Sequence, residues 1–259
     1  MPFIASTGNA AGYGHSQLPG PVIIAPNPLI YLDATNSQVS TVGVTTSKTM
    51  SNIIAVNDTF QYQFLNSTPI YGGSISFTAG STNYGYNPIS LSAAAASNSW
   101  SETKELWIRL PDTAAGSNGS LLVEEGSTTP GGGWFDAQIG MSNGVLRLGI
   151  WNGSLASFTL SAAVTRNVWH QVVWRYNSAT SAFDGFYDGT KITGITTGRQ
   201  NPSAFGYPLH YFLGVGTTTN LGSAAYMTGE IGSFKYWNSN LTDAQITSNW
   251  NATRTRFGV

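Results

Sequence analysis

The chain has 259 residues, of which 9% are charged and 41% hydrophobic, and its formal net charge is −1. Aromatic residues at 12%, together with this hydrophobic content, exclude a disordered chain, and the length suits one large β domain. The few charges are spread along the chain without a basic run, which argues against a nucleic-acid partner. The absence of cysteine excludes disulfides, thiolate catalysis and cysteine-ligated metals.

Residues 1–27 are rich in glycine, proline, alanine and serine, and we interpret them as an extended N-terminal arm. The arm either stays disordered or orders on a partner or a neighbouring subunit. It lacks the basic and continuous apolar regions of a secretory signal. No segment of the chain has the ~20 apolar residues needed to span a bilayer. Residues 28–259 show no internal repeat and form the second predicted region, a single domain.

Strand candidates begin with Pro28–Ser37 and follow at short spacing to about residue 237. The clearest pattern is NVWHQVVWRYNSATSAFDGFYDGTKITG, which begins at Asn167. Alternation puts two sets of side chains on opposite faces of its first strand, Val172, Trp174 and Tyr176 against Gln171, Val173 and Arg175. The pair Asp188-Gly189 predicts a type I′ hairpin turn, because both of its central residues need φ > 0. We predict an antiparallel meander with one face in a core.

One helix is predicted, over residues 243–252. Thr242 is the expected N-cap, and Gln245 completes a capping box with it. Leu241 and Ile246 have the spacing of a hydrophobic staple. Trp250 lies four residues after Ile246, so both side chains should share the face that packs on the sandwich.

Several segments in order resemble laminin-G-like domains of the concanavalin A-like lectin/glucanase superfamily. They are GGSISFTAGSTNYGY, ETKELWIRL, GMSNGVLRLGIWNG, the W-H-x-V…Y-x-D-G hairpin and the closing run GEIGSFKYWNSNLTDAQI. The resemblance implies an all-β, two-sheet antiparallel jelly-roll sandwich of about 12–14 strands with one short C-terminal helix. The superfamily holds lectins, glycosidases, adhesion modules and viral structural proteins, so the fold leaves the function open.

Catalytic patterns are missing from the sequence. The E-x-D-x-E type run of the related glucanases is absent. Adjacent Glu124 and Glu125 face opposite sides of a strand, as do Glu102 and Glu105 with their odd spacing. The histidines are scattered without metal-ligand spacing, at His15, His170 and His210. We predict no enzyme, although carboxylates distant in sequence could converge into a retaining glycosidase pair.

No cofactor is predicted, with calcium as the alternative that the resemblance implies at the sandwich rim. Calcium needs 6–8 oxygen ligands, and the sequence has no EF-hand type loop. Asp136 with the Asn143 turn, or Asp112 with Asn118, are the candidate ligands.

Tryptophans in strand motifs should be core, namely Trp107, Trp169, Trp174 and Trp237. Aromatic residues in or beside glycine-rich loops could instead stack on the apolar C–H faces of sugars. These candidate glycan-binding residues are Trp134, Phe135, Trp151, Tyr84 and Tyr86.

The favoured function is a non-enzymatic virion structural protein of the capsid-decoration, head-fibre or tail-fibre type. A neutral-polar surface of the kind found outside cells, without an export signal, motivates it. The arm would bind other virion proteins, and the sandwich would display weak sites for host-surface glycans, useful in many copies. A homo-oligomer is plausible. The alternatives are a bacterial surface or secreted carbohydrate-binding or adhesion module and, less favoured, a glycoside hydrolase.

Overall fold

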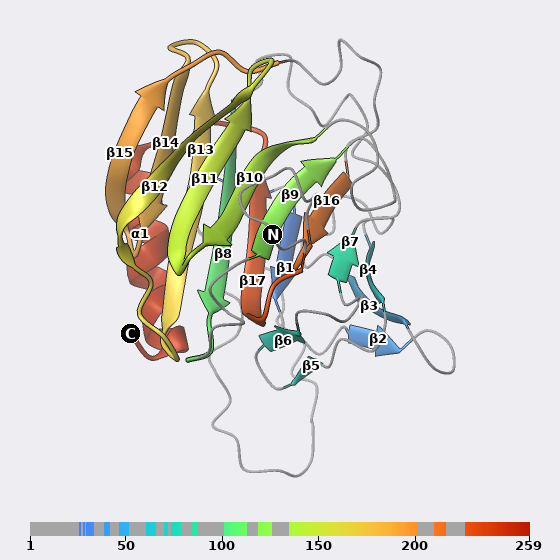
Figure 1. The fold of residues 1–259 in the computed structure, drawn as a ribbon. Helices are drawn as coiled ribbons and strands as arrows, with labels where there is room; N and C mark the ends of the chain where they lie inside the picture. The colour runs from blue at the N-terminus through green and yellow to red at the C-terminus, as the bar shows by residue number, and fades with distance from the viewer. Residues whose placement is uncertain are drawn as a thin grey trace, which may run out of the picture.

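Two antiparallel sheets and one C-terminal helix make up the computed structural model (Figure 1). It describes residues 26, 28, 30–33, 39–41, 47–51, 61–65, 70–71, 74–78, 84–86, 101–112, 119–125, 135–200, 210–215 and 226–259. The two sheets lie face to face as layers of a sandwich, with the helix at one side. No helix among these residues is long and apolar enough to cross a membrane.

The eight-stranded sheet, called sheet A, follows the order β15, β14, β13, β8, β17, β6, β5, and β1 also pairs with β17. Its strands are β15 (Thr190–Thr196), β14 (Ala182–Tyr187), β13 (Trp169–Asn177), β8 (Glu102–Arg109), β17 (Gly229–Trp237), β6 (Ser74–Phe77), β5 (Ile70–Tyr71) and β1 (Ile30–Asp33). The first and last described strands, β1 and β17, pair with each other, so segments far apart in the sequence are neighbours in sheet A.

The nine-stranded sheet, called sheet B, follows the order β12, β11, β10, β9, β16, β7, β4, β3, β2. Its strands are β12 (Leu155–Ala163), β11 (Val145–Trp151), β10 (Phe135–Ser142), β9 (Gly119–Glu125), β16 (His210–Leu213), β7 (Tyr84–Tyr86), β4 (Gln61–Leu65), β3 (Ser47–Ser51) and β2 (Val39–Thr41). The two sheets hold more strands than the 12–14 expected. The excess lies in pieces of two or three residues, such as β5 and β7, which are too short to show an alternating pattern.

Strand β13 is buried on both faces, which extends the prediction of one core face. Val172, Trp174 and Tyr176 belong to the large core cluster that draws residues from both sheets. On the opposite face Val173 belongs to a second cluster, which it forms with Phe186, Trp237, Leu241 and Ile246. Leu241 and Ile246 flank the start of the helix, so the helix covers the outer face of sheet A.

The turn between β14 and β15 is the predicted one. Asp188 and Gly189 have φ of 51° and 72°, as a type I′ turn requires. Gly189 also lies under the helix, because a Cβ there would come within 2.5 Å of the Trp250 indole. The turn glycine therefore sets both the hairpin and the approach of the helix.

Helix α1 (Asp243–Thr253) begins where the capping box predicts. The Gln245 N–H donates to Thr242 Oγ1 at 3.2 Å, and the Thr242 N–H donates to Gln245 Oε1 at 2.8 Å. A short 3-10 helix, η3 (Arg254–Phe257), extends it, and the buried Arg256 of η3 forms an ion pair with Asp33 of β1. The C-terminus is thus tied to the first described strand. Within the predicted arm, the structure describes only Pro26, whose carbonyl accepts from Trp237 Nε1 at 2.8 Å.

Thr242→Ala should lower the free energy of unfolding by about 1 kcal/mol, because the N-cap hydroxyl satisfies a helix N–H that would otherwise lose its acceptor. Urea denaturation would measure the change. Ser248→Ala is the matched control, since Ser248 is an exposed position within the same helix and alanine favours helix there. Equal losses in the two variants would contradict the capping role of Thr242.

Candidate functional site

Trp151 and Tyr84, two of the aromatic residues proposed for sugar stacking, lie far apart in the described structure. Trp151 ends β11, where its indole N–H donates to Gln200 Oε1 at 2.8 Å. Tyr84 lies in β7 with its ring 5.8 Å from that of Phe212. Three strands separate β11 from β7 in sheet B, which places Trp151 and Tyr84 about 19 Å apart at the usual strand spacing.

The other three members of that set are not tested by the structure. Trp134 lies outside the described residues. Phe135 and Tyr86 are described only as backbone, in β10 and β7. All five residues therefore stay predictions for glycan contact.

Two carboxylates distant in sequence, Glu102 and Asp136, lie close together because both bind the guanidinium of Arg199. The Arg199 guanidinium donates to Glu102 Oε2 at 2.9 Å and to Asp136 Oδ2 at 2.5 Å. Lys104 Nζ adds a contact of 2.6 Å to Glu102. All four side chains are at most 1% exposed, between the two sheets.

Glu102 in this cluster has a low pKa. Burial acts to raise the pKa of its carboxyl, but the positive charges of Arg199 and Lys104 outweigh burial and hold the pKa below its usual range. A general acid of a glycosidase needs the opposite shift and access to the substrate. The convergence of Glu102 and Asp136 is therefore suited to holding the sheets together.

Calcium is the alternative to no cofactor, and its candidate pairing of Asp136 with the Asn143 turn does not form. Asp136 is fully buried and accepts from Arg199 and from the backbone N–H of Trp151 at 2.6 Å. Asn143 follows the far end of the same strand, roughly 20 Å away at the usual rise per residue. Asp112 is exposed, and Asn118 lies outside the described residues. No group of three or more potential metal ligands occurs in the described part of the chain.

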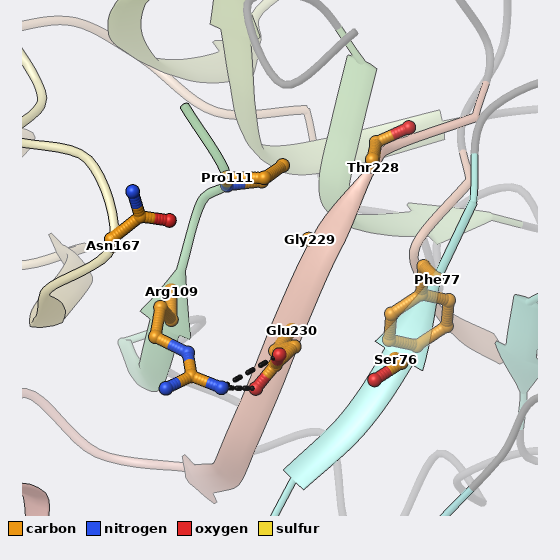
Figure 2. A pocket seen from close by; sticks show the side chains of 8 residues that line it. All are labelled: Ser76, Phe77, Arg109, Pro111, Asn167, Thr228, Gly229 and Glu230. Atoms are coloured by element: carbon orange, nitrogen blue, oxygen red, sulfur yellow. Dashed lines mark hydrogen bonds and ion pairs between the residues drawn. The ribbon is translucent and has the colours of Figure 1, made fainter. Parts of the chain in front are cut away.

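A groove of about 400 Å³ opens at the end of sheet A where β6, β8 and β17 meet (Figure 2). It is lined by Ser76, Phe77, Arg109, Pro111, Asn167, Thr228, Gly229 and Glu230. Asn167 and Pro111 lie on one side and Ser76 and Phe77 on the other, with Arg109 and Glu230 joined between them. The groove combines apolar walls with a few convergent polar groups, as small-molecule sites commonly do.

The central feature of the groove is the Arg109–Glu230 ion pair. Arg109 Nη2 donates to both oxygens of Glu230, at 2.8 and 2.7 Å. The side chains are 41% and 24% exposed, so the pair remains open to solvent. Strand register sets the pair, because Arg109 on β8 lies directly across from Glu230 on β17.

Trp169 lies beside this pair on the outer face of sheet A. The guanidinium of Arg109 is 5.2 Å from the centre of the Trp169 ring, and Phe257 packs 5.1 Å away. Gly232 makes room for both rings, since a Cβ there would lie 2.5 Å from the ring of Phe257 and 3.1 Å from that of Trp169. Trp169 is half-buried, so the expectation that it is core is wrong, whereas Trp107, Trp174 and Trp237 are buried.

Backbone geometry shapes the groove as well. Gly229 has φ of 150°, and a Cβ there would come within 2.9 Å of the Arg109 carbonyl oxygen. Asn167 has φ of 58°, and its backbone N–H donates to Leu110 O at 2.8 Å. Asparagine tolerates this left-handed conformation better than most residues. The exposed Asn167 amide offers both donors and an acceptor at the groove wall.

Sequence reasoning missed Arg109, Asn167 and Glu230. The available signal was the scarcity of charge, because only 11 basic and 12 acidic side chains occur in the chain. Arg109 is one of these few charged residues, and it ends strand β8. Its partner, 121 positions away, cannot be read from local spacing.

Comparisons with known proteins agree with this architecture. The model of the concanavalin A-like lectin/glucanases superfamily matches residues 82–247, well over half of the chain. No curated protein matches in sequence. Among solved structures, the binding domain of botulinum neurotoxin serotype D has a TM-score of 0.58 at 11% identity, over 87% of this chain and 51% of that one.

Two further structures show the same fold. Botulinum neurotoxin type C, whose cell entry is described as dependent upon interaction with two ganglioside molecules, has a TM-score of 0.56 at 13% identity, over 87% of this chain and 51% of that one. A structure titled NanB plus Optactamide has a TM-score of 0.52 at 16% identity, over 68% of this chain and 27% of that one. The chain spans about half the length of the toxin domains it resembles. The sheets, their order and the family match together show that the chain belongs to the concanavalin A-like lectin/glucanase superfamily.

Proposed function

We propose that this protein is a non-enzymatic glycan-binding sandwich whose described sugar site is the groove of Arg109 and Glu230. The main observation behind this proposal is the solvent-exposed Arg109–Glu230 ion pair, which lies beside the half-buried ring of Trp169. Sugars offer hydroxyls that both donate and accept hydrogen bonds, and they also have apolar C–H faces. The groove supplies donors, acceptors and apolar walls within one small volume.

The solved relatives support a binding role without fixing it. The serotype D structure is a binding domain, and the cell entry of the type C toxin is described as dependent upon interaction with two ganglioside molecules. At 11% and 13% identity they share the fold with this chain, so glycan binding here is a proposal from the groove itself.

A non-enzymatic role is supported by the state of six described carboxylates. Ion pairs to lysine or arginine hold Asp33, Glu102, Glu105, Asp136, Asp184 and Glu230. A glycosidase needs one carboxyl protonated at neutral pH and a second within about 5–10 Å across the substrate. The low pKa of Glu102 is the wrong shift for such an acid.

Arg109→Ala should weaken glycan binding at least about tenfold, because a hydrogen bond to a charged group contributes about 1.5–3 kcal/mol. A glycan array would identify ligands, and isothermal titration would give the affinities. Trp169→Ala should weaken the binding of the same ligands, because it removes the ring against which the Arg109 guanidinium packs. Arg254→Ala is the matched control, since Arg254 is an exposed arginine outside the groove.

The proposal fails if the wild-type chain binds no glycan on a broad array, or if Arg109→Ala and Arg254→Ala behave alike. Retained melting temperatures in all variants would show that a loss of binding is local. Turnover of a polysaccharide by the wild-type chain would contradict the non-enzymatic assignment.

The finer proposal is that the sandwich is a virion component displayed to host-surface glycans. Its support is compositional, namely few charges, no cysteine, and the neutral-polar surface over an aromatic core that this composition favours. A bacterial surface or secreted binding module shares these features. Locating the chain in a map of the intact source particle would establish the virion role, and a particle without it would end that proposal.

A further inference from the structure

The groove carries no net charge from its lining. Arg109 and Glu230 are its charged members, and each neutralises the other. Asp112, which follows Pro111 of the lining, is exposed and adds a negative charge nearby. A negatively charged ligand therefore meets no uncompensated cation in the described groove.

Glu230 also competes with any acidic ligand for Arg109. It is held across the strand pair by the register of β8 and β17, so its effective concentration at the guanidinium is high. An acidic sugar would have to displace this carboxylate and leave it beside a second negative charge. Such a like-charge contact opposes binding.

A neutral hydroxyl pair fits the same groups without displacement. Both oxygens of Glu230 use one guanidinium nitrogen, Nη2 of Arg109. Among the described residues, Nη1 and Nε of this partly exposed side chain have no hydrogen-bond acceptor. One sugar hydroxyl can accept from these nitrogens while its neighbour donates to a free lone pair of the carboxylate.

We infer that the groove selects neutral sugars that present two adjacent hydroxyls and discriminates against acidic sugars. The inference rests on the proposed function and names the ligand class of the same site. Glu230 acts in it as the specificity-determining residue, because its charge both accepts from a neutral sugar and repels an acidic one.

The test uses Glu230→Gln, which keeps the size of the side chain and removes its charge. The probes are matched glycan pairs on the full chain: neutral lactose and its sialylated form, with similar pairs that differ by one acidic sugar. Wild type should prefer the neutral member of each responding pair by about tenfold or more. Glu230→Gln should bind the acidic member about tenfold better than wild type does, because the charge of Arg109 is released. That gain should shrink as salt is added.

Two results would overturn the inference: a wild-type preference for acidic members, or an unchanged ratio in Glu230→Gln. If Glu230→Gln leaves the ratio of neutral to acidic glycan affinity unchanged while Arg109→Ala still loses binding, the specificity inference is wrong and the proposed function stands. Absence of any glycan binding defeats the proposed function itself. Melting curves of Glu230→Gln separate a local effect from misfolding.

Discussion

Replacing Arg199 with methionine is expected to lower the free energy of unfolding by about 3–5 kcal/mol, the usual cost of breaking a buried ion pair from one side. Arg199 holds both Glu102 and Asp136, and all three side chains are at most 1% exposed. Methionine fills similar space, but among the described residues it leaves Glu102 with Lys104 and removes the ion pair of Asp136.

The matched control is the same substitution at Arg109, whose partner Glu230 is solvent-open. An exposed ion pair contributes only about 0–1 kcal/mol, so Arg109→Met should be close to wild type in stability. Urea denaturation at pH 7 measures both variants. Similar losses at the two positions would contradict a special role for the inter-sheet cluster.

Acid should erase much of the difference between Arg199→Met and wild type. The pKa of Glu102 is held below its usual range, so its pairing stabilises wild type fully above the unfolded value of about 4.3. This stabilisation is lost as pH falls through the lower, folded pKa. In Arg199→Met, protonation of Glu102 removes a buried charge that lacks the Arg199 partner. The variant should therefore lose less free energy of unfolding than wild type as the pH falls. Denaturation curves from pH 7 to pH 3 should therefore converge.

Local signals predicted much of the fold. The Asp188-Gly189 turn and the Thr242–Gln245 capping box are set by residues that touch their sequence neighbours, and both occur as expected. Alternation in β13 likewise assigned the two faces of the strand, because side-chain direction follows from the backbone alone.

Long-range ion pairs could not be predicted in this way. Glu102 and Arg199 are 97 positions apart, and Asp33 and Arg256 are 223 apart. A glutamate in a strand suggests a solvent face, yet Glu102 and Glu105 of β8 are buried and pair with cations from distant parts of the chain. The candidate groove has the same origin, since register brings Arg109 against Glu230. The sequence analysis chose aromatic residues as the glycan-binding candidates because each can be recognised from its local sequence alone. An ion pair between distant strands cannot be recognised in this way.

The second large effect is expected from Trp107→Ala, which should cost about 3–5 kcal/mol as other buried tryptophan truncations do. Trp107 is fully buried on the outer face of sheet A. Its ring stacks on Phe257 at 4.1 Å and on Trp250 at 5.2 Å, so it joins β8 to both C-terminal helices. Alanine would leave a cavity under the C-terminal segment, and thermal and urea denaturation would report the loss.

Trp107→Phe tests whether packing or hydrogen bonding at this position matters. Within the described structure, the Trp107 indole N–H is buried without an acceptor, a state that costs about 1–3 kcal/mol. Phenylalanine keeps an aromatic ring between Phe257 and Trp250 and removes this donor, so the gain offsets part of the lost volume. Trp107→Phe should therefore retain most of the wild-type stability. If it is as unstable as Trp107→Ala, the N–H contributes a bond that stabilises the helix, and ring stacking is not the main term.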